Sequence, residues 1–210
     1  HDRDAGPPPA GAAAMKYFED IQVGDVIAVG RHTFAADEIK AFARRFDPQP
    51  FHVDEAAAER SHFGALCASG WHTAVIWMRL MVDRRRATAE AARARGEPVA
   101  GIGPALGFRE MKWLKPVYAG DTIDYRSEVI ETRVSNSHPR SGLMTIRSTG
   151  VNQNGERVIS FESTTFVERR AVTLEVFNQA RAKRPPLYRA ADGVDLQLHA
   201  VDAEIAPKPV

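Results

Sequence analysis

A carboxylate and an imidazole lie five residues apart in the segment DPQPFH, which spans residues 47–52. Each proline fixes its own φ and removes a backbone donor, so the loop that carries Asp47 and His52 should be stiff. A histidine can accept and return a proton near neutral pH, and a nearby carboxylate can orient it. Together the two side chains could activate a water molecule. The alternative is that Asp47 caps the turn and His52 is a loop histidine without a catalytic role.

A turn of small residues, FGALCASG, follows this loop and precedes an apolar helix. Ser69 and Gly70 lie at the expected start of the helix, where unpaired N–H groups create a partial positive charge. Because glycine lets a ligand approach the backbone closely, a developing oxyanion could bind there. An acid, a base and an oxyanion donor would then converge, which favours an active site over the simpler interpretation.

Other reactive side chains have plainer explanations. His72 is expected in the core or in a pocket wall, from which it could touch a substrate. Cys67 has apolar neighbours, so we expect a small buried hydrophobe rather than a nucleophile. His62 and His72 do not have a recognised metal-ligand spacing, and partner cysteines are missing from the sequence. We therefore predict no metal site.

The elements that must position these residues begin with a strand, expected within residues 17–34, where Val and Ile alternate around a Gly-Asp turn. Apolar residues at helical spacing predict a helix over residues 36–46. Asp47 precedes a proline and should end that helix. Asp54 is a candidate N-cap for a short helix that follows.

The helix that starts near Ser69 and runs to about Arg86 is apolar on most of its faces. A helix of this kind is usually enclosed by other structure. Residues 83–96 are expected to form its charged continuation into solvent. We interpret Arg84, Arg85 and Arg86 as part of a solvated helix end.

Long runs rich in Val, Ile, Thr and aromatic residues follow Gly96 and alternate with period two, which predicts antiparallel strands. Asn154-Gly155 indicates a hairpin with a type I′ turn, because both residues tolerate positive φ. The segment GIGPALG at residues 101–107 lacks the preceding strand and following helix of a nucleotide loop, so we expect a flexible lead-in to a strand. One core-forming helix and an antiparallel sheet predict an α+β fold in which the sheet wraps around the helix.

Length, composition and charge place limits on the class of protein. The chain has 210 residues and a net charge of +1, which gives no field for nucleic acid or an anionic membrane. Its longest apolar run is too short to span a membrane. The single cysteine fits a reducing compartment, and we expect a cytoplasmic protein. Residues 1–14 are expected to be a disordered extension or a cloning remnant, residues 15–170 one domain, and residues 171–210 a helix with an irregular tail.

The motif DPQPFHVD resembles the hydratase signature of the MaoC-like acyl dehydratases, a family that includes the (R)-specific enoyl-CoA hydratases. The resemblance continues through FGALCASG, through REMKWLKPVYAGDTI and through VNQNGERVISFE, and it covers roughly residues 17–170. It implies a single hot-dog fold, in which an antiparallel sheet wraps a long central helix. It also implies a homodimer or a dimer of dimers.

The resemblance further implies hydration of a trans-2-enoyl-CoA thioester to the (R)-3-hydroxyacyl-CoA, or the reverse dehydration. Neither a metal nor a redox cofactor is implied, because coenzyme A is part of the acyl-CoA substrate. Asp47 and His52 would activate the water and return a proton, and the N–H of Gly70 would bind the thioester oxygen. Arg109 lies near the strand that the family uses beside its acyl-CoA site, so it could meet CoA phosphates or simply be solvated.

Two residues depart from the family pattern. Gln49 replaces the usual Asn, and Ser69 replaces the His of the best-characterised hydratases. Two alternatives to hydration stay open at this point, and the departures favour the second of them. One is a hot-dog acyl-CoA thioesterase, in which water attacks the carbonyl carbon. The other is a non-catalytic acyl-CoA-binding protein.

Overall fold

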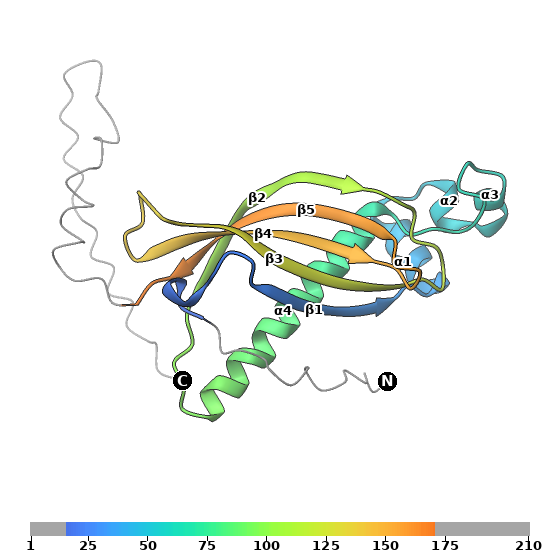
Figure 1. Ribbon diagram of the computed structural model, residues 1–210. Helices are drawn as coiled ribbons and strands as arrows, with labels where there is room; N and C mark the ends of the chain where they lie inside the picture. Colours follow the sequence, from blue (N-terminus) through green and yellow to red (C-terminus); the bar gives the residue numbers. More distant parts are fainter. Residues whose placement is uncertain (1–15, 171–210) are drawn as a thin grey trace, which may run out of the picture.

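The computed structural model describes residues 16–170, and the predictions for residues 1–14 and 171–210 lie outside this range. Within it, five strands form one antiparallel sheet in the order β1-β3-β4-β5-β2 (Figure 1). The strands are β1 (Val26–Thr33), β2 (Ile102–Trp113), β3 (Thr122–Val134), β4 (Ser141–Val151) and β5 (Arg157–Glu168). Long strands with one apolar face need a partner layer, and a single long helix supplies it.

That helix, α4 (Gly70–Ala94), lies against the concave side of the sheet and crosses the strands diagonally (Figure 1). Its buried face includes Trp77 and Met81. Trp77 packs edge to face against Phe161 of β5, with ring centroids 4.7 Å apart. The predicted α+β architecture, an antiparallel sheet wrapped around a long central helix, is confirmed. Among residues 16–170, no helix is both long enough and apolar enough to cross a membrane.

Three short helices connect β1 to α4, and the second of them contributes lining residues to the site. They are α1 (Ala36–Phe46), α2 (Pro50–Val53) and α3 (Glu55–Glu59). The predicted helix over residues 36–46 is confirmed, and Asp54 caps α3 by accepting a 2.7 Å hydrogen bond from the N–H of Ala57. The first strand starts later than expected, because residues 18–20 form a 3₁₀ turn, η1 (Phe18–Asp20).

Residues 101–107 were expected to be a flexible lead-in, and the structure corrects this. Strand β2 begins at Ile102, so most of the glycine-containing segment belongs to the strand, and Ile102 and Ala105 pair with β5. The pairing has register shifts between Ile102 and Ala105 and again between Ala105 and Phe108. Glycine and proline weaken strand signals, but an irregular edge strand tolerates both.

The hairpin between β4 and β5 is confirmed, but its turn type is not the predicted I′. Gly155 has a φ of 78°, whereas Asn154 has no positive φ. The side chain of Asn152 accepts hydrogen bonds from the N–H groups of Asn154 and Glu156. This side chain closes a longer connection, so only the glycine needs the left-handed region.

The predicted solvated helix end is wrong for two of its three arginines. Arg84 and Arg85 are partly buried and line a cavity between α4 and the sheet, while Arg86 is exposed. The reason is helical geometry, since the buried stripe of α4 continues through Met81 to Ala89 and Ala92.

Candidate active site

The loop between α1 and α2 holds Asp47 and His52 in a fixed relation. Asp47 ends α1, and its N–H donates to the carbonyl oxygen of Ala43. Gln49 caps α2, with Pro50 at the first helical position, where a missing N–H carries no penalty. The N–H of His52 then donates to the carbonyl oxygen of Gln49 at 2.9 Å. The stiff loop expected from the two prolines therefore contains a short helix, α2, that carries the histidine.

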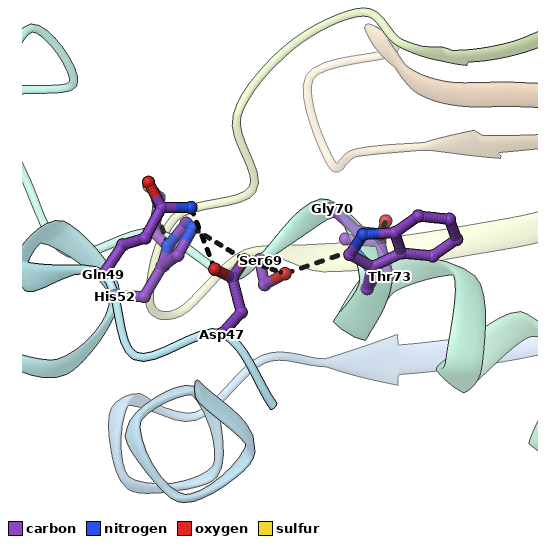
Figure 2. A network of polar contacts seen from close by, with 8 residues as sticks. Asp47, Gln49, His52, Ser69, Gly70 and Thr73 are labelled. Atoms are coloured by element: carbon purple, nitrogen blue, oxygen red, sulfur yellow. Dashed lines mark hydrogen bonds and ion pairs between the residues drawn. The ribbon is translucent and has the colours of Figure 1, made fainter. Parts of the chain in front are cut away.

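The two titratable side chains face each other. Nε2 of His52 lies 3.6 Å from Oδ2 of Asp47 (Figure 2). Nδ1 of His52 lies 2.7 Å from the carbonyl oxygen of Cys67, and a carbonyl can only accept, so Nδ1 carries the proton. In the neutral ring Nε2 therefore has a free lone pair that points towards Asp47. A water molecule that hydrogen-bonds to both atoms from the cavity side would meet a base and a carboxylate together.

Two further hydrogen bonds hold the carboxylate of Asp47. Ser69 donates to Oδ2 at 2.7 Å, and the side-chain amide of Gln49 donates to Oδ1 at 2.8 Å. Burial acts to raise the pKa of Asp47, but these hydrogen bonds and the nearby His52 lower it, and the net pKa lies below the ordinary value. Asp47 is therefore a carboxylate at neutral pH.

The start of α4 borders the same site. Ser69 is the N-cap, and its hydroxyl oxygen accepts a 3.3 Å hydrogen bond from the N–H of Trp71 while its proton goes to Asp47. The N–H of Gly70 has no acceptor within residues 16–170. It is one of the unpaired donors of a 25-residue helix, at the end where the macrodipole is positive.

Glycine is needed at position 70 for a reason that sequence analysis did not identify. A Cβ built on Gly70 would lie 2.5 Å from Nε1 of Trp113. The indole ring, rather than a free space for ligand, therefore occupies the volume beside the Cα of Gly70. Trp113 packs edge to face against Trp71, with centroids 5.1 Å apart, so the two rings form one wall near the helix start.

A cavity of about 420 Å³ joins these groups, a size typical of small-molecule sites. Asp47, Gln49 and Ser69 form a hydrogen-bonded polar cluster in its lining, and aromatic and aliphatic side chains make up much of the remainder. The lining residues are Asp47, Gln49, Phe51, His52, Phe63, Cys67, Ala68, Ser69, Gly70, Trp71, Thr73, Trp113, Leu114, Lys115, Pro116, Val117 and Val158.

Four of the six predicted site residues line this cavity: Asp47, His52, Ser69 and Gly70. His72 does not. It is buried against α1, where its ring stacks on Phe42 with centroids 4.4 Å apart and Nε2 lies 3.6 Å from Glu38. Burial lowers the pKa of His72 and outweighs the opposing effect of Glu38. His72 lies two positions after Gly70 in α4, so its side chain points from a different face of the helix.

Arg109 also lies away from the cavity. Its Nε donates to Glu162 at 3.0 Å. The neighbouring Phe108 packs against Trp77 and Phe161, so it faces α4, and the period of two directs Arg109 to the opposite face of the sheet.

Sequence reasoning missed several lining residues, most clearly Gln49 and Trp113. Gln49 was noted as a departure from a motif, but its amide holds Asp47 in place. Trp113 gave no signal, because an aromatic residue in an alternating strand ordinarily predicts core. Cys67 lines the cavity as a buried thiol, and burial raises its pKa to about 11, so it stays protonated.

Comparison with solved structures gives the same architecture. A MaoC-like dehydratase from Rhodospirillum rubrum has a TM-score of 0.63 and 40% sequence identity, over 75% of this chain and 99% of that one. An (R)-hydratase from A. caviae, involved in PHA biosynthesis, has a TM-score of 0.52 over 72% of this chain and 99% of that one. At 21% identity, this second likeness concerns the fold alone.

Among curated proteins, a mesaconyl-CoA hydratase from Cereibacter sphaeroides is 43% identical over 65 residues. The match covers 31% of this chain and 19% of the relative, so this chain matches about a fifth of that protein's length. A family model described as a MaoC-like domain matches residues 21–152, which include every residue of the Asp47–His52 loop and the start of α4. The chain belongs to the MaoC-like domain family.

Proposed function

We propose that the protein hydrates trans-2-enoyl-CoA thioesters to (R)-3-hydroxyacyl-CoA, or catalyses the reverse dehydration. One observation carries the proposal: the Asp47 carboxylate and the free Nε2 lone pair of His52 lie 3.6 Å apart in a cavity that also exposes an unpaired helix N–H. Membership of the MaoC-like family and the matched segment of a mesaconyl-CoA hydratase support the thioester substrate class.

In the hydration direction, the proposed chemistry gives Asp47, His52 and the N–H of Gly70 a role each. Asp47 orients a water, and Nε2 of His52 takes its proton as the oxygen forms a bond to C3. The electron pair of the C2=C3 bond moves towards the thioester oxygen, which the N–H of Gly70 stabilises as an enolate. The imidazolium, held by Asp47, then returns the proton to C2. The sum is addition of one water across the double bond.

The two departures from the family pattern are compatible with this role. The longer Gln49 side chain donates to Asp47, so it holds the carboxylate. Ser69 caps α4 and donates to the other oxygen of Asp47, so it links the acid to the oxyanion donor. Both replacements therefore keep the polar groups partnered.

The direct test is hydration of crotonyl-CoA, followed by loss of enoyl-thioester absorbance. Asp47→Asn and His52→Ala should each lower kcat/KM by about 10²-fold or more, the usual scale of acid–base catalysis. Asp54→Asn is the matched control, because it lies in the same segment, outside the cavity, and Asn also caps helices. Unchanged rates in both site variants would refute the assignment.

Two other activities would be distinguished by a thiol-release assay and by ligand-induced stabilisation. A thioesterase would release free thiol from a saturated acyl-CoA, which a hydratase cannot do. A non-catalytic acyl-CoA-binding protein would be stabilised by the ligand without turning over any enoyl thioester. Either result would replace hydration as the function of this cavity.

We further propose that two copies of the chain associate through β2. This strand is an edge of the sheet and pairs only with β5 among residues 16–170. Its Leu106 is 59% exposed, and Trp71 on the adjoining face of α4 is 59% exposed, with other apolar residues beside them. An apolar edge strand that continues onto an apolar helix face is suited to a second copy. The cavity wall formed by Trp71 and Trp113 would then border the interface.

Light scattering after size-exclusion chromatography tests this association. Leu106→Glu should reduce the oligomer to monomer, whereas Val134→Glu, at a similarly exposed apolar position on β3, should leave it intact. A wild-type monomer, or equal effects of the two substitutions, would contradict the proposed interface. The cytoplasmic location stays a prediction.

A further inference from the structure

A second cavity, of about 210 Å³, lies between the C-terminal half of α4 and the sheet. Its floor is apolar and comes from Ile21, which follows η1, from α4 and from all five strands. The apolar residues that matter here are Ile21, Ile27, Met81, Val129, Met144 and Val167. It shares no lining residue with the candidate active site. Arg84, on its rim, lies fourteen residues after Gly70, which along α4 corresponds to about 21 Å.

The rim of this cavity is cationic. Lys16 and Asp25 form an ion pair at 2.8 Å and so neutralise each other. Arg84 and Arg85 remain, and within residues 16–170 neither has a hydrogen bond or an ion pair. The cavity therefore combines an apolar interior with two guanidinium groups that have no anionic partner in the part of the chain that the structure describes.

Arg85 indicates an anion-binding site more strongly than Arg84 does. Its guanidinium is partly withdrawn from water, and burial lowers its pKa. Burying a charge without a partner is unfavourable, so side chains in this position usually find an anion. A planar guanidinium binds a carboxylate through two parallel hydrogen bonds, which suits Arg over Lys in such a role.

We propose that this cavity binds an amphipathic monocarboxylate, with its head on Arg84 and Arg85 and its alkyl chain on the apolar floor. The volume sets the length of the chain. At about 30 Å³ for each water-sized or methylene-sized group, the cavity holds roughly seven such groups. A carboxylate of about six carbons fits. This inference does not depend on the hydration activity.

Hexanoate is the probe, and the methionine methyl groups report where it binds. Met81 and Met144 line the cavity, whereas Met111 lines neither cavity. In the full-length protein labelled with ¹³C at the methionine methyl groups, hexanoate should shift the Met81 and Met144 signals in a saturable way and leave Met111 unchanged. Acetate lacks the alkyl chain and 1-hexanol lacks the charge. Each should bind at least about tenfold more weakly than hexanoate.

Neighbouring arginines supply the matched variants. Arg85→Gln should weaken hexanoate binding by about tenfold or more, the scale of a lost charge-assisted hydrogen bond. Arg86→Gln changes the adjacent, exposed arginine and should leave the affinity as in the wild type. Circular dichroism of both variants checks that the helix is retained.

Three results would overturn the proposal. Hexanoate could leave Met81 and Met144 unshifted, 1-hexanol could bind as tightly as hexanoate, or Arg85→Gln and Arg86→Gln could behave alike. Because the readout is binding at named methyl groups, failure here says nothing against hydration at Asp47 and His52.

Discussion

The polar groups at the two ends of α4 differ in whether they have hydrogen-bond partners. At the N-terminal end, Asp47, Ser69 and Gln49 are joined by hydrogen bonds before any ligand arrives. At the cavity beside the C-terminal half, Arg84 and Arg85 have no partner within the described part of the chain. A preorganised network suits catalysis, because no reorganisation is needed during the reaction. Unpaired charge beside an apolar wall suits capture of an anion that arrives from outside.

Substitutions in the hydrogen-bonded network at the N-terminal end of α4 should have larger effects than substitutions beside its C-terminal half. Ser69→Ala removes both the helix cap and a donor to Asp47, so we expect kcat/KM to fall by about tenfold or more and stability to fall by about 1 kcal/mol. Crotonyl-CoA hydration and urea unfolding measure the two effects. Ser61→Ala is the control, since Ser61 also makes a local hydrogen bond but does not line the cavity. An equal loss of activity in the control would remove Ser69 from the network.

Beside the C-terminal half of α4, a substitution should raise the free energy of unfolding instead of lowering it. Arg85→Met replaces a partly buried, unpaired charge by an apolar side chain of similar length, so the free energy of unfolding should rise by about 1 kcal/mol when no anion is present. Urea unfolding with and without hexanoate checks this, because hexanoate should stabilise only the wild type. A destabilised variant would show that Arg85 already has a structural partner.

A smaller effect follows from the pKa of Asp47, which lies below its ordinary value in the folded protein. The wild type should therefore gain stability over Asp47→Asn at pH values above the unfolded pKa, about 3.9, and lose this gain as the pH falls through the lower folded pKa. Thermal unfolding of both proteins between pH 3 and pH 7 measures the difference. A gain that appears only at the acidic end would reverse the sign and contradict the hydrogen-bonded carboxylate.

The smallest effect is expected at Arg109, which lies outside both cavities. Arg109→Gln removes an exposed ion pair with Glu162, so stability should change by less than about 0.5 kcal/mol and crotonyl-CoA hydration should stay near the wild-type rate. A rise in KM for crotonyl-CoA without a change in kcat would instead indicate contact with CoA, the alternative that the family resemblance left open beside a solvated role.

The sequence predicts the architecture well because each element has a strong local signal. Period-two alternation marks β3, β4 and β5, and the apolar residues on most faces of α4 mark an enclosed helix. Edge strand β2 is the exception, because its glycines and proline weaken the sequence pattern of a strand, and its pairing is irregular. Local patterns cannot report pairing that depends on a distant partner.

The site is predictable only where chemistry and local structure coincide. Asp47, His52, Ser69 and Gly70 lie at helix ends and in a stiff loop, so their positions follow from capping and proline geometry. The partners that complete the site come from elsewhere in the chain, such as the Cys67 carbonyl that fixes the His52 tautomer. The burial of Arg85 was missed for a similar reason, because a charged helix end is ordinarily solvated.

If Asp47 and His52 act on the same water molecule, a double-mutant cycle of the two residues should show it. Residues that work as one unit are strongly non-additive. We expect the protein with both Asp47→Asn and His52→Ala to hydrate crotonyl-CoA about as slowly as His52→Ala alone. If the two losses instead multiply to about 10⁴-fold, the side chains act independently and the shared-water mechanism is wrong.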